Sequence, residues 1–216
     1  MKVLIFTSSY KRPYMLRQCI LNAKNQSYDN YIHSVGIMYD LEPLFSEIVY
    51  DDLYSDKLII NDFANSHTHF NNINVMKAVP EYEDYDIYIK MDDDDVYKAN
   101  YVKSIVEFFK ANPDTDIVSS NIVTQINGEN VYLGQYSDLG NLYSGDYRMP
   151  MTYAFNKKAF NAIKNLEPKD ISGYDDMTWR MHWNAHRLKV SVVNNEYNIV
   201  WHIHGDNTST ASFLRK

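Results

Sequence analysis

The sequence is poor in the residues that build disulfide-stapled or glycine-rich structures. Its 216 residues include only 7 Gly, 6 Pro and 1 Cys. The single cysteine, Cys19, excludes an internal disulfide and favours a reducing compartment. No segment matches G-x-G-x-x-G or G-x-x-x-x-G-K-[ST], the glycine-rich signatures that cradle phosphates. A bound nucleotide would therefore be held by side chains, by backbone groups at strand ends and by a metal ion.

The sequence also lacks a long hydrophobic run and an excess of positive charge. No stretch approaches the roughly 20 apolar residues of a membrane-spanning helix, and the apolar run at residues 3–6 is too short for the core of a signal peptide. The formal net charge is −7, which argues against a nucleic-acid partner, because a phosphate backbone requires a basic face. We therefore expect a cytoplasmic protein whose contact with a membrane is at most peripheral.

The first half of the chain alternates short apolar runs with helical patterns. Strands are predicted at residues 3–7, 31–38, 57–61 and 86–91, and helices at residues 13–25, 71–79 and 101–109. Pro13 suits the first turn of the first of these helices. Such alternation predicts an α/β fold in which a mostly parallel central sheet is flanked by helices.

The pattern becomes mixed after Pro113. Strands are predicted at residues 117–125, 131–133, 151–155, 190–193 and 199–202, and helices at residues 157–165 and 173–188. The dipeptide Asn127-Gly128 between the first two strands favours a hairpin. We therefore expect a small mixed β element in the second half, within one domain that spans residues 1–216.

Four consecutive aspartates follow the predicted strand at residues 86–91. Residues two apart in an extended chain share a side, so Asp92 and Asp94 would point together at the edge where open α/β sheets bind ligands. Carboxylate oxygens are preferred ligands of Mg²⁺ and Mn²⁺. In the alternative interpretation the run is a solvated loop in which Asp94 or Asp95 caps the next helix, and Asp95 is the favoured cap. We favour a metal site.

A second acidic position lies on the predicted helix at residues 173–188. Asp176, Trp179 and Trp183 would share a face of this helix, so a carboxylate could accept a proton beside indole rings that stack on a sugar. In the alternative interpretation Asp176 pairs with Arg180 and both tryptophans belong to the core, which helical spacing alone favours. The residues predicted to form the buried stripe of the helix are Tyr174, Met177, Met181 and Leu188.

Two histidines close to the carboxyl end complete the candidate residues. His202 and His204 are two apart and would share a face of a strand. A neutral imidazole there could complete a metal shell or bond a phosphate oxygen. For His204 metal ligation and a structural role both stay open, and His202 is the less favoured ligand.

Four segments of the chain together resemble family 2 glycosyltransferases of the GT-A fold, and they occur in the order of that family. Residues 3–13 (VLIFTSSYKRP) resemble its first strand, residues 85–95 (YDIYIKMDDDD) its DxD strand, residues 173–176 (GYDD) its catalytic acidic pair, and residues 204–209 (HGDNTS) its C-terminal histidine segment. The resemblance implies a GT-A, Rossmann-like domain with a nucleotide-sugar-binding half, residues 1–112, and an acceptor-binding half, residues 113–216.

The resemblance also implies an activity and its cofactors. We expect a metal-dependent, inverting, hexosyltransferase-type enzyme of polysaccharide biosynthesis. It would use Mn²⁺ or Mg²⁺ to move a sugar from a nucleotide-diphosphate donor, with a UDP-sugar favoured, to a hydroxyl of a glycan or lipid-linked acceptor.

Individual roles follow from the resemblance position by position. The expected metal ligands are Asp92 and Asp94 as the DxD pair, with Asp95 and His204. The expected general base is Asp176, with Asp175 as its neighbour. The expected nucleotide contacts are Thr7, Arg12 and Asp40. One departure concerns Asp40, which is followed by Leu41-Glu42-Pro43 where the family commonly has a second Asp and Gly-Ser. The nucleotide role of Asp40 and the choice of uridine therefore stay open.

Two other functions fit parts of the pattern. A sugar-1-phosphate nucleotidyltransferase also combines an α/β nucleotide domain with an acidic metal site, but it would carry a glycine-rich basic loop after the first strand, where this chain has Ser8-Ser9-Tyr10. A non-catalytic carbohydrate- or metal-binding module would bind a ligand without turnover.

Overall fold

The computed structural model describes residues 1–10, 12–37, 53–63, 71–121, 123–126, 129–131, 152–166, 175–194 and 199–203. For residues 71, 121, 123–126, 129–131, 175, 177, 194 and 201–203 it describes the backbone alone. Two predicted site residues, Asp40 and His204, lie outside the described residues, as does the dipeptide Asn127-Gly128.

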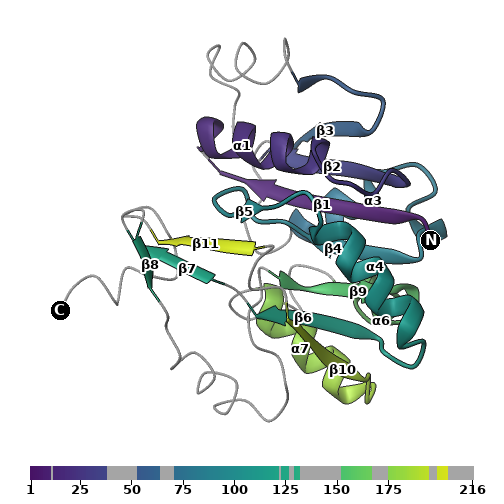
Figure 1. The fold of residues 1–216 in the computed structure, drawn as a ribbon. Helices are drawn as coiled ribbons and strands as arrows, with labels where there is room; N and C mark the ends of the chain where they lie inside the picture. The colour runs from purple at the N-terminus through teal and green to yellow at the C-terminus, as the bar shows by residue number, and fades with distance from the viewer. Residues whose placement is uncertain are drawn as a thin grey trace.

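A seven-stranded sheet forms the centre of the described structure, in the order β10-β6-β9-β4-β1-β2-β3 (Figure 1). Its strands are β1 (Val3–Ser9), β2 (Tyr31–Ile37), β3 (Leu58–Asp62), β4 (Ile87–Lys90), β6 (Ile117–Asn121), β9 (Ala154–Asn156) and β10 (Val190–Asn194). All pairings in this sheet are parallel except those of β9, which runs antiparallel to β4 and β6. The predicted mostly parallel sheet is confirmed.

Helices cover both faces of this sheet (Figure 1). They are α1 (Pro13–Lys24), α3 (Asn71–Lys77), α4 (Tyr101–Ala111), α6 (Lys157–Ile163) and α7 (Asp175–Ala185), with a short 3₁₀ helix, η2, at Tyr82–Asp84. Side chains of α1 and α4 pack with Val3, Ile5 and Ile89 on one face. Side chains of α3, α6 and α7 pack with Leu4, Phe6 and Tyr88 on the other face. The two sets of strand residues point to opposite faces because side chains alternate along a strand. No helix in the described ranges has the length and apolar content needed to span a membrane.

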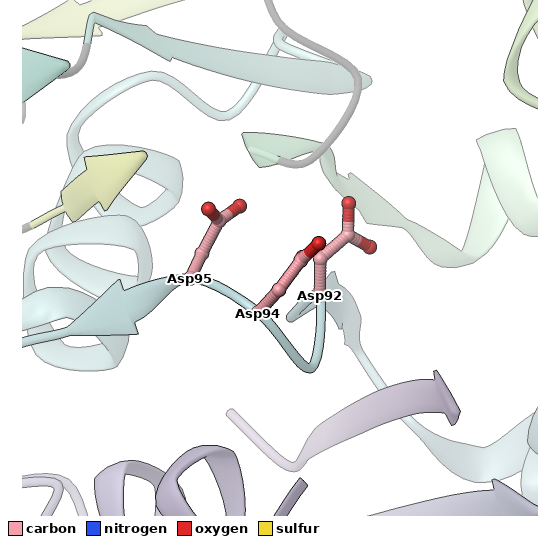
Figure 2. A group of neighbouring side chains, drawn as sticks. All are labelled: Asp92, Asp94 and Asp95. Carbon is pink, nitrogen blue, oxygen red and sulfur yellow. The ribbon is translucent and has the colours of Figure 1, made fainter. Parts of the chain in front are cut away.

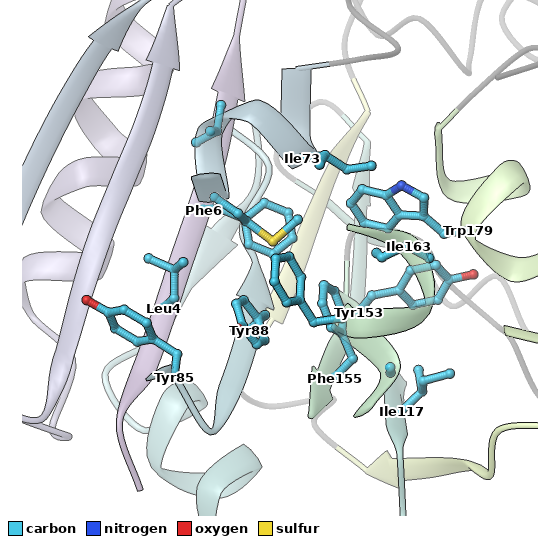
Figure 3. Packing of buried hydrophobic residues seen from close by; sticks show 14 of the residues in the cluster. Leu4, Phe6, Ile73, Tyr85, Tyr88, Ile117, Tyr153, Phe155, Ile163 and Trp179 are labelled. Atoms are coloured by element: carbon cyan, nitrogen blue, oxygen red, sulfur yellow. The ribbon is translucent and has the colours of Figure 1, made fainter. Parts of the chain in front are cut away.

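The core beneath α7 is built from aromatic rings (Figure 3). Trp179 lies edge-on to Phe6, with ring centroids 6.1 Å apart, and Trp183 packs on Phe155 at 5.3 Å. Both tryptophans are fully buried, and the indole N–H of Trp183 donates to the carbonyl oxygen of Ala159. The alternative interpretation of the two tryptophans as core residues is therefore correct, and their prediction as an exposed platform for a sugar is wrong.

The buried stripe predicted for this helix is confirmed only in part. Leu188 packs against the core, whereas Met181 does not, and Tyr174 and the side chain of Met177 lie outside the described part of the chain. Met181 was expected inside but is 65% exposed, while Thr178 and Trp179 are buried. The helix is turned so that its two large rings, rather than its methionine, fill the space against β9. Burial of a tryptophan removes more apolar surface from water than burial of a methionine, which favours this orientation.

A second, four-stranded sheet lies beside the central one, in the order β5-β11-β7-β8. It consists of β5 (Val96–Tyr97), β7 (Val123–Ile126), β8 (Glu129–Val131) and β11 (Ile199–Ile203). The antiparallel pairing of β7 with β8 confirms the predicted hairpin, and the parallel pairing of β7 with β11 makes the sheet mixed, as expected. The single strand predicted at residues 117–125 is wrong, because β6 joins the central sheet and β7 joins the smaller one.

Candidate metal-binding site

The four aspartates lie in a turn between β4 and β5, at the edge of the sheet where β1 and β4 both end. Met91, fully buried, closes β4, and the chain then turns so that the amide nitrogen of Asp95 lies 3.5 Å from the carbonyl oxygen of Asp92. The helix that follows begins after its N-cap residue, Asn100. The prediction that Asp95 caps this helix is therefore wrong.

Three of the four carboxylates converge on one side of the turn (Figure 2). Asp92, Asp94 and Asp95 can each offer one oxygen atom such that these atoms all lie within 4.8 Å of one another. Strand alternation predicted only Asp92 and Asp94 on this side; the turn adds Asp95, because a tight turn does not keep the two-residue period of a strand. Three carboxylate oxygens at this spacing suit a hard divalent cation such as Mg²⁺ or Mn²⁺, which completes its shell with water or phosphate oxygens.

Asp93 points the other way and ties the turn to the end of β1. It is 1% exposed, and the hydroxyl of Ser9 donates to its Oδ2 at 2.6 Å. Nη2 of Arg12 lies 2.7 Å from its Oδ1. Burial raises the pKa of Asp93, while Arg12 opposes this by favouring the ionised carboxylate. This anchor was not predicted from the sequence. Ser9 ends β1 and Arg12 follows it, and the parallel pairing of β1 with β4 places both beside the acidic run.

Two basic side chains partly neutralise the converging carboxylates. Arg12 forms a second ion pair, with Asp94, and Nζ of Lys90 lies 3.0 Å from Oδ1 of Asp92. Burial lowers the pKa of Arg12, but the attraction of Asp93 and Asp94 outweighs it, so the net shift is upward. Burial raises the pKa of Asp92 and Lys90 opposes that rise. Counted as formal charges, the four carboxylates and these two bases leave an excess of at most two negative charges, since the pKa values of Asp92 and Asp93 are raised, and one divalent cation would neutralise it.

Thr7 supports the site from below rather than facing solvent. Its side chain is fully buried, and its hydroxyl donates to the carbonyl oxygen of Met91 at 2.8 Å. Because the hydroxyl has one proton, Nε2 of His33, at 2.9 Å, must donate to the Thr7 oxygen. Burial lowers the pKa of His33 to about 3, so the ring is neutral at pH 7. Thr7 was expected to contact the nucleotide, but in the described structure its side chain has no exposed surface.

The remaining candidates lie on α7. Asp175 and Asp176 form the first turn of this helix, and the Asp176 side chain is partly exposed. Helix α7 packs on the face of β4 that carries Tyr88, opposite the face covered by α4. Among the described residues, the group of carboxylates, histidines and cysteines spaced for a metal ion consists of Asp92, Asp94 and Asp95.

Comparisons with known proteins concern the fold. No protein-family model matches the sequence, and no curated protein matches it significantly. The structure is similar to S. aureus TarS 1–349 in complex with UDP-GlcNAc, with a TM-score of 0.68 and 11% identity over 98% of this chain and 61% of that one. It is also similar to the mannosyltransferase PcManGT from Pyrobaculum calidifontis in complex with GDP-Man and Mn²⁺, with a TM-score of 0.63 and 14% identity over 94% of this chain and 56% of that one.

These two likenesses confirm the predicted GT-A fold, a mostly parallel sheet flanked by helices, which both proteins share with this chain. The chain spans less than two thirds of the length of either protein.

Proposed function

We propose that the chain is a metal-dependent glycosyltransferase that moves a sugar, a hexose in the favoured case, from a nucleotide-diphosphate donor to a hydroxyl of a glycan or lipid-linked acceptor. The observation that carries the proposal is the convergence of Asp92, Asp94 and Asp95 at the end of β4. Proteins with the same fold have been crystallised with UDP-GlcNAc and with GDP-Man and Mn²⁺. A UDP-sugar is our favoured donor and family 2 our favoured assignment.

In this proposal the three converging carboxylates would hold the cation, Mn²⁺ or Mg²⁺, with His204 as a further ligand. A divalent cation bound there would supply positive charge that offsets the charge developing on the diphosphate as it leaves the sugar. Asp93, Ser9 and Thr7 keep the turn in place beneath it, since their hydrogen bonds connect the turn to β1.

The second half of the proposal concerns the acceptor. Asp176, with Asp175 as its neighbour, accepts the proton of the acceptor hydroxyl as the oxygen attacks the anomeric carbon from the side opposite the diphosphate. Attack from that side inverts the configuration of the sugar. Asp40 contacts the base or ribose. The roles of Asp40 and His204 rest on the sequence resemblance. The buried thiol of Cys19 supports a reducing compartment such as the cytoplasm, and synthesis of a polysaccharide is the process we favour.

The metal site is tested by calorimetry with UDP, GDP and TDP, each with and without Mn²⁺. We expect one nucleoside diphosphate to bind, and to bind more tightly with Mn²⁺. In the variant Asp94→Asn this metal dependence should be lost. The matched control is Asp114→Asn, an exposed carboxylate just beyond α4, which should behave as the wild type. Affinity that is equal with and without Mn²⁺ would contradict the proposal.

Catalysis is tested by the slow hydrolysis of nucleotide sugars in the presence of Mn²⁺. Asp176→Asn should lose turnover while it retains the metal-dependent affinity for the nucleotide, because the base contacts the acceptor side. Unchanged activity in this variant would contradict the assignment of Asp176 as the general base. Formation of a nucleoside triphosphate from pyrophosphate and the sugar donor would instead indicate a nucleotidyltransferase, and binding without any turnover would indicate a binding module.

A further inference from the structure

One arginine connects the buried anchor of the acidic turn with the group that faces the proposed cation. Nη2 of Arg12 lies 2.7 Å from Asp93, whereas Nη1 pairs with Asp94. The two carboxylates differ in surroundings, since the Asp93 side chain is 1% exposed and that of Asp94 is 12% exposed. The guanidinium makes both contacts through its two terminal nitrogens, a forked geometry that a single lysine nitrogen does not reproduce.

The position of Arg12 in the chain is not explained by local structure. It is the N-cap residue of α1, and its side chain makes no capping hydrogen bond. Ser, Thr, Asp and Asn are preferred at an N-cap, and a cation is unfavourable at the positive end of the helix dipole. A residue that breaks local preference in this way is expected where a tertiary contact or a function requires it. For Arg12 that contact is the pair of aspartates.

The two ion pairs of Arg12 would respond differently to a cation. Asp93 also accepts from Ser9 and points away from the three converging oxygens, so its bond to Arg12 can persist. Asp94 belongs to the converging group. A divalent cation bound there and the guanidinium of Arg12 would both be attracted to the Asp94 carboxylate. With both beside the same carboxylate, the two positive groups would repel each other.

We propose that Arg12 is a positioning residue that competes with the cation for Asp94 while it stays bound to Asp93. This rests on the proposed function, because it takes the three aspartates to be the metal site. The consequence is that a bare cation binds weakly. A nucleoside diphosphate would favour the cation in this competition. Its phosphate oxygens are further ligands for the cation, and their negative charge can pair with the Arg12 nitrogen that Asp94 releases. Arg12 thus couples the arrival of the metal to the arrival of the donor.

The test is the affinity for Mn²⁺ alone, measured by calorimetry and by the electron paramagnetic resonance signal of free Mn²⁺. In the double variant Arg12→Gln/Asp93→Asn one positive and one negative charge are removed together, so the net charge is kept and Asp94 is released. We expect bare Mn²⁺ to bind roughly tenfold more tightly, the factor that corresponds to one charge-assisted hydrogen bond of modest strength. The gain in affinity on adding UDP should become smaller by a similar factor.

Two further variants separate competition from a purely structural role. Arg12→Lys keeps a charge beside Asp93 but lacks the second terminal nitrogen that pairs with Asp94, so its hold on Asp94 should weaken and bare Mn²⁺ should also bind more tightly. It decides the question if the double variant does not fold. Ser9→Ala loosens the anchor without releasing Asp94, and it should leave the affinity unchanged or weaker.

The possible results are distinct. Equal or weaker Mn²⁺ binding in folded Arg12 variants overturns the competition, and so does an equal tightening in Ser9→Ala. In both cases the metal site itself stands if the wild type binds Mn²⁺ with UDP. Absence of Mn²⁺ binding by the wild type, with and without UDP, overturns the metal site and the role of Arg12 together.

Discussion

Replacement of Asp95 by asparagine tests whether the acidic turn is held under electrostatic repulsion until a cation binds. The converging oxygens of Asp92, Asp94 and Asp95 lie within 4.8 Å of one another. Two unit charges at such a distance repel by at least about 3.5 kcal/mol at an effective dielectric constant of about 20. Asp95 takes part in two such pairs, and the nearby bases Lys90 and Arg12 offset much of the sum. We expect Asp95→Asn to be about 1–2 kcal/mol more stable than the wild type without divalent cations.

The assay is unfolding by urea and by heat, first in EDTA and then in excess Mn²⁺. For a chain of this length the expected gain in EDTA corresponds to a rise in Tm of about 2–8 °C. A cation at a hundred times its Kd stabilises the wild type by about 2.7 kcal/mol. The variant should gain much less, so the order of stability should reverse in Mn²⁺. Asp114→Asn serves as the control, with no change in either condition. A variant that is less stable than the wild type in EDTA would refute the reasoning.

Three further outcomes concern the fold around the site. Gly36→Ala should lose about 1–3 kcal/mol of stability, because the new Cβ would lie 2.1 Å from Cγ2 of the buried Val75, and Val75→Ala added in the same chain should restore part of it. Asp116→Asn should lose about 2–4 kcal/mol in urea unfolding, since the buried carboxylate accepts from a lysine, an asparagine and the backbone at the start of β10. Burial lowers the pKa of His33 to about 3, below its value of about 6.5 in the unfolded chain, so its contribution to stability is lost as the pH falls below 6.5. Compared with His33→Gln, the wild type should lose about 2 kcal/mol between pH 7 and pH 5, and equal pH profiles would contradict the buried neutral ring.

The position of the acidic run could be predicted from the sequence because an apolar strand leads directly into it. Strand alternation accounts for Asp92 and Asp94 but not for Asp95, which was expected as a ligand through the family resemblance alone; the turn of the chain brings it to the same side. The anchor formed by Asp93 and Arg12 depends on the pairing of β1 with β4, strands that are not consecutive in the chain. A sequence pattern has no signal for that pairing.

Helix α7 shows a second limit of sequence patterns. Helical spacing allowed two buried faces, one through Met181 and one through Trp179 and Trp183, and composition did not choose between them. The choice was made by Phe6 and Phe155, which come from distant parts of the chain and supply the rings against which the tryptophans pack. The existence of the helix was thus a local property, while its orientation was a tertiary one.

The insertion of β9 between β4 and β6 has a consequence for the order in which the site forms. Strand β4, which leads into the acidic turn, has β1 on one side and the much later β9 on the other, and the amide of Lys90 donates to the carbonyl oxygen of Tyr153. A nascent chain that has emerged only as far as α4 would already contain all four aspartates, but β4 would be an edge strand, paired with β1 on one side and with no strand on the other. Contacts between residues so distant in sequence form slowly, since a long loop must close first. The geometry of the acidic turn is therefore completed late in folding, and a chain cut before residue 152 should carry the motif without the site.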